Sequence, residues 1–130
     1  PFLDRIDLCV EASRIRYDDL TENHSGESSA VIRERVCRAR EIQKERYKET
    51  DIKINAMLKS DDLKRFCVLG KEENELMERA YSVMGLTARA YHRVLKTART
   101  IADMDGKRMI SVKHLREALG YRMIDRKYWG

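Results

Sequence analysis

The stretch of sequence that decides the fold reads GLTARAYHRVLKTARTIADMDG and runs from Gly85 to Gly106. Its apolar residues recur every three or four positions, which predicts a single amphipathic helix. Thr87 is expected to cap the start of this helix, with Leu86 and Tyr91 packed together across the first turn. Gly106 is expected to end it, as glycine often does just past a last turn. The apolar face comprises Tyr91, Val94, Leu95, Ala98, Ile101 and Ala102.

The opposite face of this helix carries a band of basic residues. At 3.6 residues per turn, Arg89, Arg93 and Lys96 fall on one narrow strip that no acidic residue interrupts. Arg89 lies in the first turn, where a cation opposes the helix dipole and brings no structural gain. We therefore expect a functional role, in which an anion is held by the free backbone N–H groups and by the guanidinium.

Four further helices are expected, over residues 28–50, 60–67, 70–85 and 111–120. Ser28 or Ser29 is expected to cap the first of them, and Ser111 the last. In the helix over residues 28–50, the inward-facing residues are expected to be Ile32, Val36, Ala39 and Gln43. Its remaining surface is expected to carry Arg33, Arg35, Arg38, Arg40 and Arg46. The predicted fold class is mainly α, a small bundle of four or five helices.

The beginning of the chain differs from the rest. Ile6, Leu8 and Val10 alternate with polar or smaller residues, which predicts a short β-strand. Residues 1–27 carry three arginines and seven acidic residues, so their net charge is −4, while the whole chain carries +5. We therefore divide the chain into residues 1–24, the trailing edge of another domain, and residues 25–130, a helical domain. Since a single strand cannot bury itself, the chain is expected to be a piece of a longer protein.

Composition and motifs exclude several classes of protein. No apolar run approaches the ~20 residues needed to cross a membrane. Cys9, Cys37 and Cys67 form no CxxC pair, so we expect neither a metal site nor a disulfide framework, but reduced thiols in the cytoplasm. Phosphate-binding loops of the GxxxxGK[ST] and GxGxxG types and the GxSxG elbow are absent from the sequence. The histidines, which lack metal-ligand spacing, are interpreted as solvated or capping residues: His24, His92 and His114. A self-contained enzyme is therefore not expected.

The basic residues leave two alternative functions open. Glu34, Glu41 and Glu45 interrupt the arginines of the first long helix, which favours a solvated face there. Residues 28–130 nevertheless carry a net charge of +9, which is compatible with a stand-alone helical module that binds nucleic acid. A module that only bridges subunits is a further alternative. The basic and aromatic tail, residues 121–130, yields no prediction of its role.

Several segments match a known family pattern: ESSAVIRERV at residues 27–36, NAML at 55–58, GLTARAYHRVLKTARTIAD at 85–103 and HLREALGYR at 114–122. The chain closely resembles the C-terminal domain of the bacterial magnesium-chelatase-like AAA+ ATPases of the ComM type. PFLDRID at residues 1–7 resembles the end of that family's ATPase core. The resemblance implies a helical lid that follows its own AAA+ core, in a homo-hexameric ring that binds Mg-ATP. ComM-type members act on DNA as branch-migration motors in recombination and natural transformation, whereas chelatase subunits drive magnesium insertion into a porphyrin.

The resemblance also implies roles for two arginines. Arg5 matches the arginine finger, a catalytic residue that reaches the γ-phosphate bound by the neighbouring subunit. Arg89 matches the sensor-2 arginine, which contacts the nucleotide from the lid. The chain departs from the family pattern at Thr87, where serine is usual, and at Gly120, where glutamine is usual. Because the phosphate loop and the magnesium-binding acidic motif are absent, this fragment alone is not expected to hydrolyse ATP.

Overall fold

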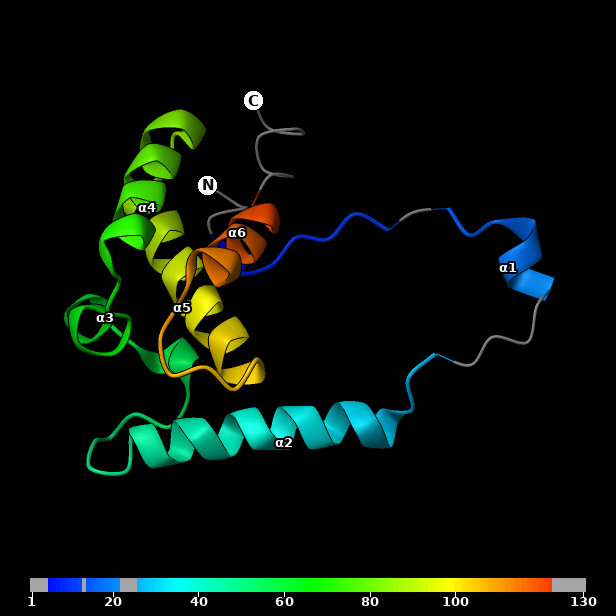
Figure 1. The fold of residues 1–130 in the computed structure, drawn as a ribbon, viewed down its shortest axis with the longest axis horizontal. Coiled ribbons are helices and arrows are strands. Elements are labelled where there is room, and N and C mark those ends of the chain that lie inside the picture. Colours follow the sequence, from blue (N-terminus) through cyan, green and yellow to red (C-terminus); the bar gives the residue numbers. More distant parts are fainter. Residues whose placement is uncertain (1–4, 13, 22–25, 123–130) are drawn as a thin grey trace.

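The computed structural model describes residues 5–12, 14–21 and 26–122, which are mainly helical (Figure 1). The elements are α1 (Tyr17–Thr21), α2 (Ser29–Arg46), the short 3-10 helix η2 (Asn55–Met57), α3 (Ser60–Phe66), α4 (Lys71–Met84), α5 (Ala88–Met104) and α6 (Val112–Gly120). The predicted fold class, a small helical bundle, is therefore confirmed. α1 was not predicted; it is short and none of its residues is buried. None of the helices in the described part is long and apolar enough to cross a membrane.

Helix α5 is the centre of the bundle: it packs against α6, α2, α3 and η2, while α4 packs mainly against α6 (Figure 1). Its predicted apolar face supplies the innermost residues, since Ala98 and Ala102 are completely buried and Val94 almost so. Leu115 and Ala118 of α6 and Met77 of α4 complete the contact. Small alanines let α6 approach α5 closely, while the larger side chains fill the space around them. The sequence pattern thus places α5 in the core with its basic band outward.

Several helix ends lie where the sequence predicts, although α2 ends at Arg46 rather than near residue 50. The hydroxyl of Thr87 accepts a hydrogen bond from the N–H of Ala90 at 3.0 Å, and Ser28 accepts one from Val31 at 3.2 Å. Gly85 ends α4 with φ 63°, a left-handed conformation that glycine adopts without steric cost. Gly106, with φ 68°, turns the chain after α5 in the same way. The start of α5, where Arg89 lies, is therefore fixed by a glycine turn and a cap.

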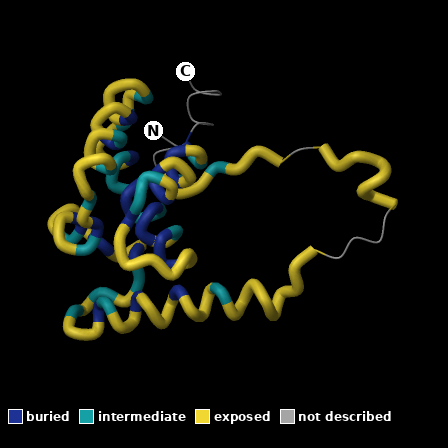
Figure 2. The backbone as a smooth tube through the Cα atoms, viewed as in Figure 1, coloured by how far each residue is buried: buried dark blue, intermediate teal, exposed yellow. Residues whose placement is uncertain are grey.

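Helix α2 departs from its predicted inner face. Ala39 and Gln43 are buried as expected, but Ile32 and Val36 are exposed to 44% and 41%. Figure 2 shows why: the C-terminal half of α2 lies against the bundle, whereas its N-terminal half runs out past it. The apolar stripe continues along the helix beyond the point where the bundle ends, so periodicity alone did not show where burial stops.

The predicted strand at the start of the chain is wrong. Residues 6–12 form no strand in the structure, and they run as an irregular segment beside the end of α6. The N–H of Cys9 donates to the carbonyl of Tyr121 at 3.2 Å, and Arg122 Nη1 donates to the carbonyl of Ile6 at 2.6 Å. A strand needs a ladder of backbone hydrogen bonds to a second strand, and helical neighbours cannot provide one. The predicted domain boundary at residues 24–25 and the tail at 123–130 lie outside the described residues.

Candidate functional site

The basic band of α5 lines a cavity of about 460 Å³. Arg89, His92, Arg93 and Lys96 form one wall, so the structure brings together the three cations that the sequence placed on one strip. The opposite wall comes from the end of the η2 segment and the start of α3: Leu58, Lys59, Ser60 and Leu63. A hollow with four formal positive charges and no acidic lining residue among those described is suited to binding an anion.

Arg89 is exposed at the first turn of α5. It makes no hydrogen bond or ion pair with any of the described residues, although Arg93 one turn later does. Thr87 satisfies the N–H of Ala90, while the other free N–H groups of the first turn remain at the same end of the helix. The guanidinium of Arg89 therefore keeps its five donors available to a ligand near a helix N-terminus.

Arg5, the other predicted site residue, is exposed and does not line this cavity. Its segment is nevertheless held next to the basic band, because Asp7 forms an ion pair with Arg93. Arg5 thus lies on the same segment as a residue that contacts α5. The structure brings the two predicted arginines to neighbouring elements, without direct contact between them.

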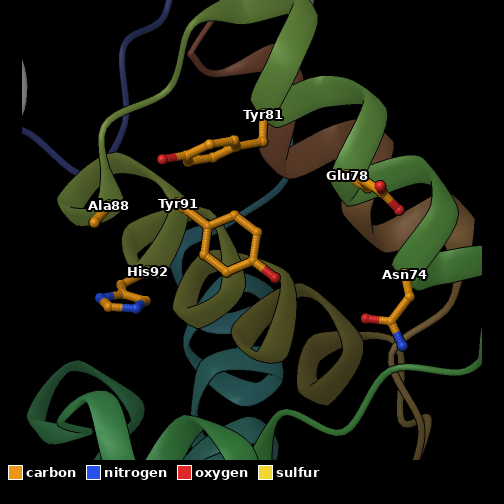
Figure 3. Close-up of a pocket in the computed structure, with 6 residues that line it drawn as sticks. All are labelled: Asn74, Glu78, Tyr81, Ala88, Tyr91 and His92. Carbon is orange, nitrogen blue, oxygen red and sulfur yellow. The ribbon is translucent and has the colours of Figure 1, made fainter.

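A second cavity, of about 520 Å³, lies between α4 and α5 (Figure 3). It is lined by Asn74, Glu78 and Tyr81 of α4 and by Ala88, Tyr91 and His92 of α5. The ring of Tyr91 meets Tyr81 edge to face, with 6.0 Å between ring centres, and meets His92 at 5.9 Å. His92 lines both cavities, so a cationic and an aromatic hollow adjoin along α5. The aromatic cavity was not predicted, because the helical spacing of Tyr91 indicates a core residue.

A buried polar network fixes the opposite end of α5. The carboxylate of Asp103 pairs with Arg46 of α2, lies 3.3 Å from Arg99, and accepts a hydrogen bond from Asn55 at 2.9 Å. Tyr47 donates to the side-chain oxygen of Asn55 at 2.6 Å. Burial, together with the charge of Arg46, lowers the pKa of Arg99. The network ties α2, η2 and α5 together and so orients the helix that carries Arg89.

Burial raises the pKa of Cys67, which lies beside this network, to about 11 from an ordinary value of 9.0. The folded thiol is therefore still neutral at a pH where the unfolded thiol has already ionised. Its contribution to stability is complete below pH 9.0, and is lost as the pH rises toward about 11. Two pKa units correspond to about 2–3 kcal/mol. Urea unfolding at pH about 8 and about 10.5 should therefore show a smaller loss of stability in Cys67→Ala than in the unmodified chain.

The control for this measurement is Cys37→Ala, since Cys37 is exposed on α2. That variant should lose stability with rising pH as steeply as the unmodified chain. Equal losses in Cys67→Ala and Cys37→Ala would show that the Cys67 thiol contributes nothing to the pH dependence.

The capping role that the sequence predicts for a histidine is confirmed at His114, while His92 lines the two cavities. His114, in α6, is buried, and its Nδ1 accepts a hydrogen bond from the N–H of Ser111 at 3.0 Å. The proton of the neutral ring is therefore on Nε2, which donates to Asp105 at 2.9 Å. His114 is thus a capping residue, while His24 lies outside the described residues. Across the described ranges, no group of three or more His, Cys, Asp or Glu side chains is placed to hold a metal ion.

Comparison with known proteins identifies the family of this chain. Residues 26–122 match the family model described as magnesium chelatase, subunit ChlI C-terminal. The chain belongs to this magnesium chelatase C-terminal family. It is 46% identical over 127 residues to competence protein ComM of Haemophilus influenzae, and 43% identical over the same length to protein YifB of Escherichia coli K12. In both cases the match covers 97% of this chain and 24% of the relative, so the chain spans about a quarter of these proteins.

Membership in the magnesium chelatase C-terminal family covers most of the helical bundle. The matched residues include every element from α2 to α6, and they end at Arg122. The family assignment therefore rests on the part of the chain that forms the cationic cavity.

Proposed function

We propose that this chain is the lid of a ComM-like AAA+ ATPase, and that Arg89 is its sensor-2 arginine, which contacts the nucleotide phosphates. The observation that carries the proposal is the exposed guanidinium of Arg89, which lines a cavity rich in cations and has no hydrogen-bond or ion-pair partner among the described residues. Family membership supports it, because the parent class binds Mg-ATP.

Mg-ATP, held mainly by the core domain of the parent, supplies the phosphoryl group whose transfer drives the ring. The residues of the lid contribute binding and orientation. Arg89 is placed to donate two parallel hydrogen bonds to phosphate oxygens, and this geometry suits a planar guanidinium better than a lysine. Because the start of α5 is fixed by Thr87 and Gly85, closure of the lid carries the guanidinium toward the nucleotide as a rigid unit. ATP turnover of Arg89 variants tests this role directly.

Arg5 is proposed to act in trans as the arginine finger of the ring. Its side chain is exposed, and its segment precedes the helical bundle. A guanidinium supplied to a neighbouring γ-phosphate stabilises the charge of the transition state and accelerates hydrolysis by about 10³- to 10⁵-fold. Each ring therefore depends on the finger of every subunit.

A mixing experiment tests this trans role. When full-length Arg5→Ala protein is mixed with an equal amount of unmodified protein, ATP turnover is expected to fall by more than the half that dilution explains. The physical reason is that each variant subunit disables the active site of its neighbour. Mixing with Arg14→Ala, a substitution of another exposed arginine near the start of the chain, is the matched control. A strictly proportional decrease with Arg5→Ala would contradict the trans assignment.

The activity of the whole parent is also a proposal. Similarity to competence protein ComM favours a homo-hexameric motor that moves branched DNA during recombination in natural transformation. A role as the ATPase subunit of a magnesium chelatase is the alternative within the same family. ATP turnover stimulated by branched DNA, and unaffected by a porphyrin, distinguishes the two. The three free cysteines fit a reducing cytoplasmic location.

One observation favours a second function, the binding of nucleic acid by the bundle itself. The exposed surface of α2 carries Arg33, Arg38 and Arg40. Binding of this kind releases counterions, so the affinity of the isolated chain for DNA would fall steeply with salt and would not depend on nucleotide. If the affinity for DNA depends only weakly on salt, this second function is contradicted and the lid function is the one that remains.

A further inference from the structure

The basic band of α5 concentrates positive charge that the described acidic residues balance only in part. Arg89, Arg93 and Lys96 lie four and three residues apart, so neighbouring cations share one face of the helix. Like charges at this spacing destabilise a helix. Lys59 adds another cation from the facing wall of the cavity. A cluster of this kind is relieved by an anion that contacts several of its members.

One carboxylate of the described residues contacts this band. Asp7, on the irregular segment before α1, pairs with Arg93 through a single oxygen–nitrogen contact. The side chain of Asp7 is 62% exposed, and that of Arg93 is 27% exposed. Exposed ion pairs of this type are weak, because water screens them and because ordering two side chains costs entropy. A polyphosphate carries more negative charge and offers paired oxygens, so it competes effectively for the same guanidinium.

We propose that Arg93 is a second phosphate-binding residue of the cavity, and that Asp7 occupies it until phosphate arrives. Both guanidiniums line the same cavity, one helical turn apart, so one chain of phosphate groups can contact them together. This inference rests on the proposed function of Arg89. It adds an internal competitor, an acidic side chain of the same chain that must leave before the ligand is fully bound.

Release of Asp7 also changes the restraint on Arg5. Among the described contacts, Arg122 donates a hydrogen bond to the carbonyl of Ile6, and the N–H of Cys9 donates one to the carbonyl of Tyr121. Asp7 lies between these two residues and pairs with Arg93 of α5. When phosphate binds Arg93, the segment keeps its hydrogen bonds to the end of α6 but loses its ion pair with α5. Binding of phosphate in the cavity therefore reduces the restraint on the segment that carries Arg5, the proposed arginine finger.

Titration of this chain with inorganic tripolyphosphate, followed by calorimetry, tests the proposal. Asp7→Asn should bind tripolyphosphate about two- to fivefold more tightly than the unmodified chain, because no carboxylate has to be displaced. Arg93→Gln should bind it about tenfold more weakly, as expected for the loss of a charge-assisted hydrogen bond. In the double variant, Asp7→Asn should no longer tighten the binding of tripolyphosphate, because the guanidinium with which Asp7 pairs has been removed.

The matched control is Asp61→Asn, which removes an exposed acidic charge at the start of α3, beside the cavity but with no contact to Arg93. Two results would show that the net charge of the chain explains the effect: Asp61→Asn tightens binding as much as Asp7→Asn, or Asp7→Asn still tightens binding in the Arg93→Gln background. Either result would contradict the role of Asp7 as a competitor of phosphate. Absence of tripolyphosphate binding by the unmodified chain would also overturn this inference. The proposed function is judged separately, by the ATP turnover of Arg89 variants in the full-length protein.

Discussion

Replacing Arg89 by alanine in the full-length protein is expected to reduce kcat/KM for ATP by roughly 10- to 150-fold. This range corresponds to the loss of about 1.5–3 kcal/mol, the usual contribution of hydrogen bonds to a charged group. The bundle should remain folded, because Arg89 is exposed and forms no hydrogen bond or ion pair with the described residues. Removing a cation from the first turn should even stabilise α5 slightly, by about 0.3–1 kcal/mol. Steady-state turnover and thermal unfolding of the same preparation measure both effects.

Arg116→Ala is the matched control for this substitution. Arg116 is an exposed arginine of α6 that does not line the cationic cavity. Its removal changes the net charge by the same amount, so turnover should stay close to that of the unmodified protein. If Arg89→Ala and Arg116→Ala reduce turnover equally, the effect is one of overall charge and the sensor-2 assignment fails.

The substitution with the largest expected effect on stability is Asp103→Asn. Asp103 is 2% exposed and lies between the guanidiniums of Arg46 and Arg99. An asparagine in its place leaves two buried or half-buried cations without a counter-ion, and its amide group donates where the carboxylate accepted. Breaking a buried pair in this way costs about 3–5 kcal/mol. A domain of this size is stable by only about 5–15 kcal/mol, so urea unfolding should show a large decrease in midpoint.

A compensated variant separates charge from packing at this position. When Asp103→Leu is combined with Arg46→Met and Arg99→Met, no buried charge is left unpaired. Such replacements of whole ion-pair networks by apolar residues are often neutral in stability. The triple variant should therefore be more stable than Asp103→Asn alone. If it is equally unstable, the loss in Asp103→Asn comes from the hydrogen bond to Asn55 rather than from the cations.

The helices were predictable because their signals are local. The cap at Thr87 and the glycine turn at Gly106 are predicted from single residues, and both are confirmed in the structure. The strand over residues 6–10 was predicted wrongly because alternation indicates a strand only if a partner strand is present. The exposure of Ile32 has a similar cause, since burial depends on how far the neighbouring elements extend.

The site was predictable in part. The spacing of Arg89, Arg93 and Lys96 placed them on one strip, and they do share a cavity. The facing wall and the partner of Arg93 come from residues distant in sequence, so spacing could not show them. Arg46 was interpreted as a surface residue, whereas it pairs with buried Asp103. The spacing of Arg99 and Asp103, four residues apart beside the buried alanines, was a signal that could have indicated the network.

The one-sided support of α2 has a mechanical consequence. The helix has 18 residues, which at 1.5 Å per residue makes a rod of about 27 Å. It is attached to the bundle near its C-terminal end, where Arg46 pairs with Asp103 of α5. A rotation of about 10° at that end therefore displaces the far tip by about 5 Å, by the geometry of a rod of this length. A small rotation of α2 at its attachment to α5 therefore produces a larger displacement at its N-terminal end.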